Sequence, residues 1–149
     1  MPRTVLVLSG PNLSALGSRE PEIYGRQTLD QLHDEIVQAG VALGLDCEVR
    51  QSDDEGQVVA WLHEAAQRGC DVVLNPAAFT HYSYAVADAG AHLVGCGCAL
   101  IEVHLSNPAG RESFRRHSVV APVATGTIAG FWGHSYVLAL QALAQRATP

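Results

Sequence analysis

The alternation of short apolar runs with longer segments of helical periodicity is the feature that most limits how this chain can fold. The first run, Thr4–Leu8, reads TVLVL, and a later run, Asp71–Leu74, reads DVVL. Runs in which apolar residues follow one another without polar alternation are typical of parallel strands covered on both faces. The sequence therefore predicts an α/β fold in which helices pack on both faces of a parallel sheet.

Five strands and four longer helices are expected along the chain. The strands are expected at Thr4–Leu8, Cys47–Arg50, Asp71–Leu74, Ala99–His104 and Val119–Val123. The helices are expected between Thr28 and Gly44, from the capping-box stretch Ser52–Glu55 to Gly69, over Tyr82–His92, and over Ile128–Arg146, where Val137, Leu138, Leu140 and Leu143 face the core. Right-handed crossovers between such strands give a doubly wound, flavodoxin-like five-stranded parallel sheet in the order 2-1-3-4-5.

The composition predicts a single globular domain spanning residues 1–149. Apolar residues make up 48% of the chain and charged residues 16%, and the formal net charge is −6. Surfaces that bind duplex nucleic acid usually carry a basic excess, so no nucleic-acid partner is expected. The amino terminus lacks a signal-peptide pattern, and no apolar run approaches the roughly 20 residues that span a bilayer, so a cytoplasmic location without membrane contact is expected.

The four cysteines, Cys47, Cys70, Cys96 and Cys98, are interpreted as small buried hydrophobic residues rather than as a disulfide set. The stretch Cys96-Gly97-Cys98 is also compatible with a metal hook. However, no second pair of Cys or His residues stands at ligand spacing, so the hook is the less favoured interpretation.

Polar residues gather in the segments that follow the first, third and fourth expected strands. These residues are Asn12, Arg19 and Tyr24, then Asn75 and His81, then Glu102, His104 and Ser106, with Arg115 farther along. Ligands of doubly wound sheets bind outside the carboxyl ends of the strands, so these side chains are expected to share one small-molecule site. The first loop has no glycine-rich nucleotide motif. A metal bound by His81, His104, His117 and Glu102 remains an alternative, but it lacks compact ligand spacing and leaves the arginines unexplained.

Acid–base chemistry on a small anion fits these residues best. A phenol ionises near pH 10, and a nearby guanidinium that lowers the pKa of Tyr24 by about 2–3 units must supply about 3–4 kcal/mol. Arg19 stands on the same loop and keeps its charge. His104 is the candidate acid, and Glu102, two residues away on the same strand face, can orient its ring. A packing role for Tyr24 and a core role for His104 remain the competing interpretations.

Three motifs resemble those of type II 3-dehydroquinate dehydratases: GPNLxxLGxREPxxYG, NPAAFTHYS and LIEVHLSNPxxRExFRxHS. Together they cover nearly the whole chain in order. The resemblance implies dehydration of 3-dehydroquinate to 3-dehydroshikimate, a step shared by the shikimate and quinate pathways. It also implies a flavodoxin-like subunit, a homododecamer arranged as a tetramer of trimers, and no metal or organic cofactor.

The resemblance further implies a role for each matched residue in an anti elimination through an enolate. Tyr24 would be the base, activated by Arg19, and Asn12 would help to stabilise the enolate through water. His104 would be the acid, oriented by Glu102. The substrate would be bound by Asn75, His81, Arg115 and the backbone N–H groups of Leu105 and Ser106, while Asp88 would reach a neighbouring subunit's site. The loop 17–25 would close over the substrate as a lid.

The chain departs from the family pattern at a few places outside the proposed acid–base residues. Ser14 stands where Asn is common, and Ala87 precedes Asp88 where Arg is usual, which puts an inter-subunit contact in doubt. The connection 94–98 is longer than expected, and 130–135 replaces a more glycine-rich stretch. Two other functions stay open, namely a non-catalytic binder of a cyclic polyhydroxy acid and a metal-dependent hydrolase.

Overall fold

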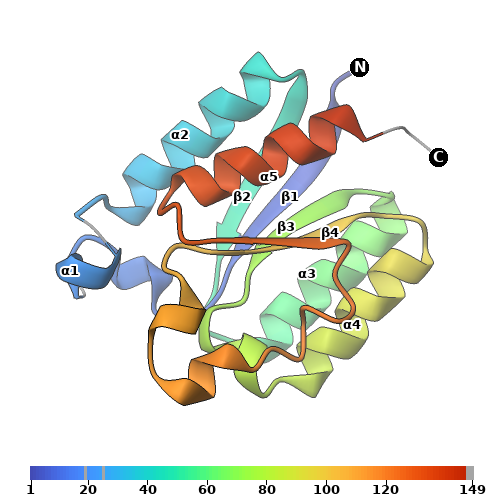
Figure 1. Ribbon diagram of the computed structural model, residues 1–149. Helices are drawn as coiled ribbons and strands as arrows, with labels where there is room; N and C mark the ends of the chain where they lie inside the picture. The colour runs from blue at the N-terminus through green and yellow to red at the C-terminus, as the bar shows by residue number, and fades with distance from the viewer. Residues whose placement is uncertain (19, 25, 147–149) are drawn as a thin grey trace.

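The chain forms a five-stranded, all-parallel sheet in the order β2-β1-β3-β4-β5, which confirms the predicted fold class (Figure 1). The computed structural model describes residues 1–18, 20–24 and 26–146. The strands are β1 (Arg3–Ser9), β2 (Leu45–Gln51), β3 (Asp71–Asn75), β4 (Leu100–His104) and β5 (Gly126–Ala129). Because all five run in one direction, their carboxyl ends meet at a single edge of the sheet.

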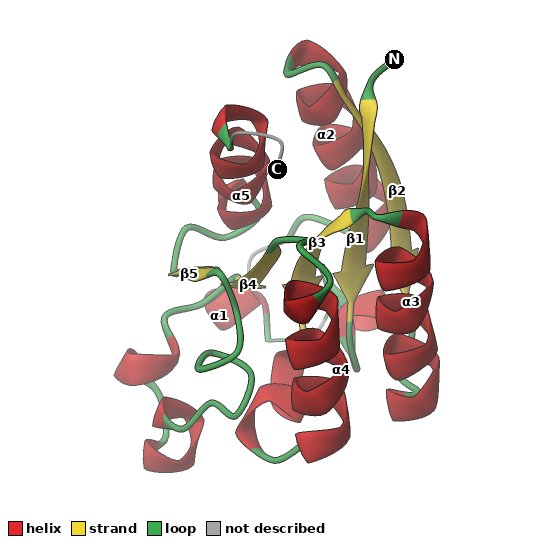
Figure 2. Ribbon diagram, turned by 90° about the vertical axis from the view of Figure 1, so that its right-hand side faces the viewer, coloured by secondary structure: helices red, strands yellow, loops and turns green. Residues whose placement is uncertain are grey.

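Helices cover both faces of the sheet (Figure 2). The helices are α1 (Pro21–Tyr24), α2 (Leu29–Ala42), α3 (Glu55–Arg68), α4 (Tyr84–Gly95) and α5 (His134–Gln145), and the 3-10 turns are η1 (Leu13–Ala15), η2 (Ala77–His81), η3 (Pro108–Gly110) and η4 (Ser113–Arg116). α2 and α5 pack on one face, and α3 and α4 pack on the other.

The alternation of side chains along β1 shows why the strand is apolar throughout. Val5 and Val7 pack into the core beneath α2 and α5. Leu6 and Leu8 pack into the second core beneath α3 and α4. All four side chains are buried, and burial of one such side chain stabilises the fold by about 1.5–3 kcal/mol. The central strand therefore contributes to both cores at once.

The helix starts follow the predicted capping chemistry, with one shift. Thr28 accepts a hydrogen bond from the Gln31 backbone N–H and donates its own to the Gln31 side chain, so α2 begins with a full capping box. At α3 the cap is Asp54, which accepts from Gly56 N–H at 2.8 Å, rather than Ser52. Ser52 instead accepts from Asp54 N–H at 3.0 Å and fixes the turn before the helix. The Asp54 carboxylate, which stands directly before the helix, thus accepts a backbone N–H of the first turn that has no partner within the helix.

The fifth strand is not where the sequence predicted it. The stretch Val119–Val123 is a turn, and β5 lies at Gly126–Ala129. Val119 N–H donates to Thr80 O at 2.7 Å, which ties the stretch to η2 rather than to β4, and Val120 is buried beneath α3 and α4. The apolar side chains of this stretch pack against the core from a turn rather than from a strand. Pro122 also has no N–H to donate to a neighbouring strand.

The last helix consequently starts later than expected, at His134. Residues 126–129 pair with β4 instead of opening a helix. Gly130 and Trp132 have φ values of 98° and 53°, which turn the chain between the strand and the helix. The core face of α5 is formed by Tyr136, Ala139, Leu140 and Leu143, while Val137 and Leu138 are only partly buried.

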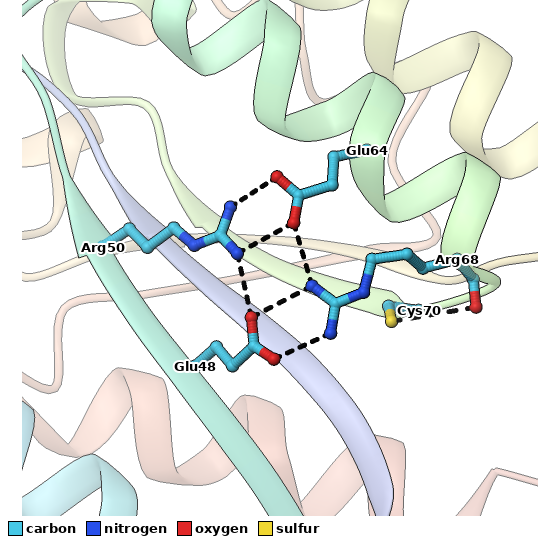
Figure 3. A network of polar contacts seen from close by, with 5 residues as sticks. All are labelled: Glu48, Arg50, Glu64, Arg68 and Cys70. Carbon is cyan, nitrogen blue, oxygen red and sulfur yellow. Dashed lines mark hydrogen bonds and ion pairs between the residues drawn. The ribbon is translucent and has the colours of Figure 1, made fainter.

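An ion-pair network fixes α3 to the edge strand β2 (Figure 3). Arg50 donates to Glu64 at 2.7 Å and to Glu48 at 2.9 Å. Arg68 donates to Glu48 at 2.7 Å and to Glu64 at 2.9 Å. Hydrogen bonds from Arg50, followed by those from Arg68, lower the pKa of Glu64 to about 2. Each arginine thus bridges the strand and the helix.

Replacing Glu64 with Gln should lower stability at neutral pH, by an amount that shrinks in acid. Because the pKa of Glu64 is lower in the folded protein than the ordinary 4.5, its contribution is complete above pH 4.5 and is lost as the pH falls toward 2. Urea unfolding of both proteins at pH 7 and near pH 3 measures the difference. Asp46→Asn, at an exposed position of β2, is the matched control for the loss of one surface carboxylate. An equal Glu64→Gln deficit at both pH values would contradict this account.

Candidate active site

A pocket of about 210 Å³ opens at the carboxyl edge of β1, β3 and β4. Its lining includes seven of the residues expected to share a site, namely Asn12, Asn75, His81, His104, Leu105, Ser106 and Arg115. In Figure 1 the orange segment after β4 lies beside the loops that follow β1 and β3 at this edge. The strand order, rather than closeness in sequence, brings these side chains together.

Two of the expected residues that the structure describes, Glu102 and Asp88, are absent from this lining. Glu102 lies beneath the pocket on β4, and Asp88 is exposed on α4. Tyr24 is the last residue of α1, and Arg19 lies outside the described residues. The expected lid 17–25 includes two positions outside the described residues. The Arg19–Tyr24 pairing and the lid therefore stay predictions.

The buried carboxylate of Glu102 organises the acid end of the site. Its Oε2 lies 2.6 Å from Nε2 of His104, and the residue is 2% exposed. Thr80 donates its hydroxyl to the same carboxylate, and Ser118 donates at 3.2 Å to Oε1. Burial raises the pKa of Glu102, but the hydrogen bonds from His104, Thr80 and Ser118 outweigh it and hold the pKa below its ordinary value. Glu102 is therefore ionised at neutral pH.

An ionised Glu102 dictates how the His104 ring is used. The carboxylate favours a proton on Nε2, the nitrogen that faces it, and holds the ring in one orientation. His104 also lines the pocket, so Nδ1 is the ring nitrogen available to a bound molecule. The pair can deliver or accept a proton at a fixed place in the pocket.

Asn75 is positioned by an interaction that the sequence did not reveal. Its side chain is 3% exposed, and Oδ1 accepts from Ala77 N–H at 3.1 Å. Tyr136, from the distant helix α5, hydrogen-bonds to the Asn75 side chain and lies 2.8 Å from the Ser9 hydroxyl. Burial raises the pKa of Tyr136 to about 12, so it remains a neutral phenol. In a sequence, a tyrosine at helical spacing from apolar residues indicates only a core residue. The contact between Tyr136 and Asn75 therefore could not be predicted.

The loop that carries Asn12 depends on Asp53, another residue that the sequence did not single out. Asn12 has a left-handed backbone with φ 70°, and its N–H donates to Asp53 Oδ1 at 2.9 Å. Gln51 donates to the same oxygen at 3.0 Å and to Gly10 O at 3.1 Å. A Cβ at Gly10 would lie 2.8 Å from Pro76 O, so only glycine lets the two loops approach this closely.

His81 and Arg115 are held around Phe114 of η4. Nδ1 of His81 lies 2.8 Å from the carbonyl of His117, which can only accept, so Nδ1 carries the proton and Nε2 is an acceptor. The Arg115 guanidinium lies over the Phe114 ring at 4.6 Å and donates to Glu112 at 2.5 Å. The His81 ring meets the same phenyl group edge-on at 5.7 Å. One aromatic side chain therefore orients two polar groups.

The pocket is locally positive in an acidic protein. Arg111 and Arg115 both line it, and the described lining residues include no Asp or Glu. Arg111 donates to the Ser106 hydroxyl at 3.4 Å. The sequence contained the signal for Arg111, since it stands within the third motif, four residues before Arg115. Two guanidinium groups favour an anionic ligand.

Among the described residues, no group of three or more His, Cys, Asp or Glu side chains is arranged to hold a metal ion. Among the helices of the same residues, none combines the length and apolarity that a bilayer crossing requires.

Comparison with known proteins decides between the remaining interpretations of this pocket. Residues 3–144 match the family described as dehydroquinase class II. The chain belongs to this family. Class II dehydroquinases are hydro-lyases, so the chain is an enzyme rather than a binding module.

Relatives and solved structures agree with this membership over nearly the whole chain. A 3-dehydroquinate dehydratase of Salinispora tropica is 54% identical over 143 residues, 96% of this chain and 98% of that protein. One of Halalkalibacterium halodurans is 50% identical over 140 residues, 94% of each chain. The crystal structure of a type II dehydroquinase from Propionibacterium acnes superposes with a TM-score of 0.94 at 51% identity, covering 98% of this chain and 99% of that one.

Replacing Thr80 with Val should weaken the acid end of the site without changing its shape. The variant loses one donor to the Glu102 carboxylate, which costs about 1–3 kcal/mol and raises the pKa of Glu102 toward its ordinary value. Activity that needs ionised Glu102 is then lost at a higher pH as the solution is acidified. The pH profile of kcat/KM measures this shift, with Thr127→Val, at an exposed position of β5, as the control. An unmoved acidic limb would show that Thr80 does not support Glu102.

Proposed function

We propose that this chain dehydrates 3-dehydroquinate to 3-dehydroshikimate by anti elimination through an enolate. The observation that carries the proposal is the Glu102–His104 pair, 2.6 Å apart, opening into a pocket lined by Arg111 and Arg115. The substrate is a β-hydroxy ketone with a carboxylate. Its conversion needs a base, stabilisation of an oxyanion and an acid, in that order.

The first step removes a proton beside the ketone and places negative charge on the ketone oxygen. Tyr24 would be the base as its phenolate, stabilised by the Arg19 guanidinium. Asn12, which lines the pocket on the loop after β1, would hold a water that donates to the enolate oxygen. The left-handed backbone that Asp53 fixes at Asn12 supports this placement.

The second step expels the tertiary hydroxyl as water. His104 would protonate this leaving group from the nitrogen that faces the pocket, and the enolate electrons would form the new carbon–carbon double bond. The buried charge of Glu102 then stabilises the imidazolium before the proton leaves and orients the ring throughout. Base and acid would act on opposite faces of the substrate ring, as anti elimination requires.

The remaining polar groups of the lining would bind the substrate. Asn75 and His81 can hydrogen-bond to ring hydroxyls, and Arg115 brings positive charge to the same pocket. The backbone N–H groups of Leu105 and Ser106 would hold the carboxylate. The Arg111 guanidinium, on the same wall as Ser106, adds to the field that favours an anion.

We further propose that the enzyme acts as a homododecamer, a tetramer of trimers, of single-domain subunits in the cytoplasm, without metal or organic cofactor. Asp88 is exposed on α4 and does not line the pocket of its own chain, which supports a role toward a neighbouring subunit's site. Large apolar side chains, including Tyr82, Tyr84 and Phe114, are also exposed and are suited to contacts between subunits. The reaction would serve the shikimate pathway or quinate breakdown.

Replacing Tyr24 with Phe tests the base. Addition of 3-dehydroquinate to the wild type should produce the ultraviolet absorbance of a conjugated enone, and chelators should not change the rate. Tyr24→Phe should lower kcat by about 100-fold or more with little change in substrate affinity, because only the proton acceptor is lost. Tyr84→Phe, at an exposed position of α4, is the control. No new absorbance with the wild type, or undiminished turnover of Tyr24→Phe, would refute the proposal.

Replacing Arg19 with Met tests how the base is activated. Without the guanidinium the pKa of Tyr24 should rise toward its reference value near 10. Activity that requires the phenolate appears as the pH rises through that pKa, so the basic form of the variant is reached at more alkaline pH. The pH profile of kcat should move upward by about 2 units. A profile that keeps its wild-type position would remove Arg19 from this role.

A further inference from the structure

A second pocket lies at the opposite edge of the sheet, where β1, β3 and β4 begin. Its volume is about 420 Å³, and its described lining shares no residue with the candidate active site. Three of the four cysteines line it, Cys70, Cys96 and Cys98, together with three arginines, Arg3, Arg68 and Arg146. Thiols and guanidinium groups therefore share one cavity that the dehydration chemistry does not use.

The three thiols differ in access. Cys96 is exposed at the end of α4, and its Sγ lies 3.7 Å from Nε2 of His92, one helical turn earlier. Cys98 and Cys70 are each 6% exposed. Burial raises the pKa of the Cys98 and Cys70 thiols, whereas Cys96 has a histidine within reach to accept its proton. Cys96 is the thiol placed to react first with a molecule from solution.

Cys96 and Cys98 line the same pocket and stand two residues apart in the chain. Residues two apart along a chain have Cα atoms at most about 7 Å apart, and a disulfide needs about 4.4–6.8 Å. Between them the chain turns at Gly97, which has φ 91° and donates its N–H to Val94 O at 3.0 Å. A Cβ at Gly97 would meet no atom within 4 Å, so the turn has room to adjust.

The pocket wall beside this turn carries excess positive charge. Arg146 donates to Asp71 at 3.1 Å and to Gly97 O at 3.3 Å, and Arg3 lies 3.8 Å from the same Asp71 carboxylate. Asp71 is the one carboxylate among the described lining residues, and it faces two guanidinium groups. The Arg146 guanidinium at Gly97 O offsets the partial negative charge at the carboxyl end of α4, next to Cys96. It also attracts carboxylates from solution.

We propose that Cys96 and Cys98 form a dithiol site that reduces small disulfides carrying carboxylate groups. The Cys96 thiolate attacks one sulfur of the small disulfide after His92 takes its proton, which forms a mixed disulfide and releases one thiolate that takes up a proton. The Cys98 thiolate then attacks Cys96 Sγ, forms the Cys96–Cys98 disulfide and releases the second thiolate. Two electrons pass from the two cysteines to the small disulfide. Proximity compensates for the burial of Cys98 in the second step.

The test uses oxidised glutathione as the probe and the arginines of the chain as cleavage sites. Cleavage after arginine places Cys70, Cys96 and Cys98 on one peptide, 69–111, and Cys47 on another, 27–50. Reduced protein is treated with the probe, remaining thiols are alkylated, and both peptides are weighed by mass spectrometry. We expect peptide 69–111 to lose two hydrogen atoms and keep one alkylated cysteine. Burial raises the pKa of the Cys47 thiol to about 11, which leaves less of it as thiolate. The peptide that carries Cys47 should therefore react at least about tenfold more slowly.

Single substitutions identify the role of each thiol in the proposed reaction. Cys98→Ser should hold a stable glutathione adduct on Cys96, Cys96→Ser should form neither adduct nor disulfide, and Cys70→Ser, the matched control, should behave as the wild type. His92→Gln should slow adduct formation about tenfold.

Cystamine, a disulfide with amines in place of carboxylates, should react about tenfold more slowly than oxidised glutathione. Equal labelling of Cys47 and Cys96, a disulfide that survives in Cys98→Ser, or faster reaction with cystamine would overturn the proposal. Dehydratase activity should be unchanged in all three cysteine variants, so this result is independent of the proposed function.

Discussion

A buried carboxylate in the middle of the sheet determines much of the structure around the candidate site. Glu102 interrupts the apolar run of β4 and must be satisfied by hydrogen bonds, because an unpaired charge in that position would cost several kcal/mol. The partners come from three places, His104 on β4, Thr80 on η2 and Ser118 beyond η4. By drawing these segments together, the carboxylate also draws together the walls of the pocket.

The same interaction explains where the sequence misled. Val119–Val123 has the composition of a strand, but Ser118 is held at Glu102 and also accepts from Ala121 N–H at 2.9 Å. With Val119 bonded to Thr80 O, the chain turns there instead of pairing with β4. The edge strand that does form, Gly126–Ala129, is short and only partly buried, so it has little hydrophobic signal. Tertiary hydrogen bonds here override local propensity.

The parts that could be predicted are those fixed by local chemistry or by the strand order. Four strands were located, three of them from apolar runs. The capping box at Thr28 located a helix start, and the parallel topology assembled Asn12, Asn75, His81 and His104 at one edge. Supporting contacts such as Tyr136 with Asn75 join residues about 60 positions apart through packing alone. No spacing or motif in the chain announces such a contact, so only the folded structure reveals it.

The network of Glu48, Arg50, Glu64 and Arg68 has a consequence beyond fixing a helix. β2 lies at an edge of the sheet, where unpaired backbone groups offer a template for another chain to add a strand. Charged side chains from β2 itself, clamped in place by α3, would have to be stripped of their partners before a foreign strand could dock there. The ion-pair network thus protects this edge of the sheet against strand addition and aggregation.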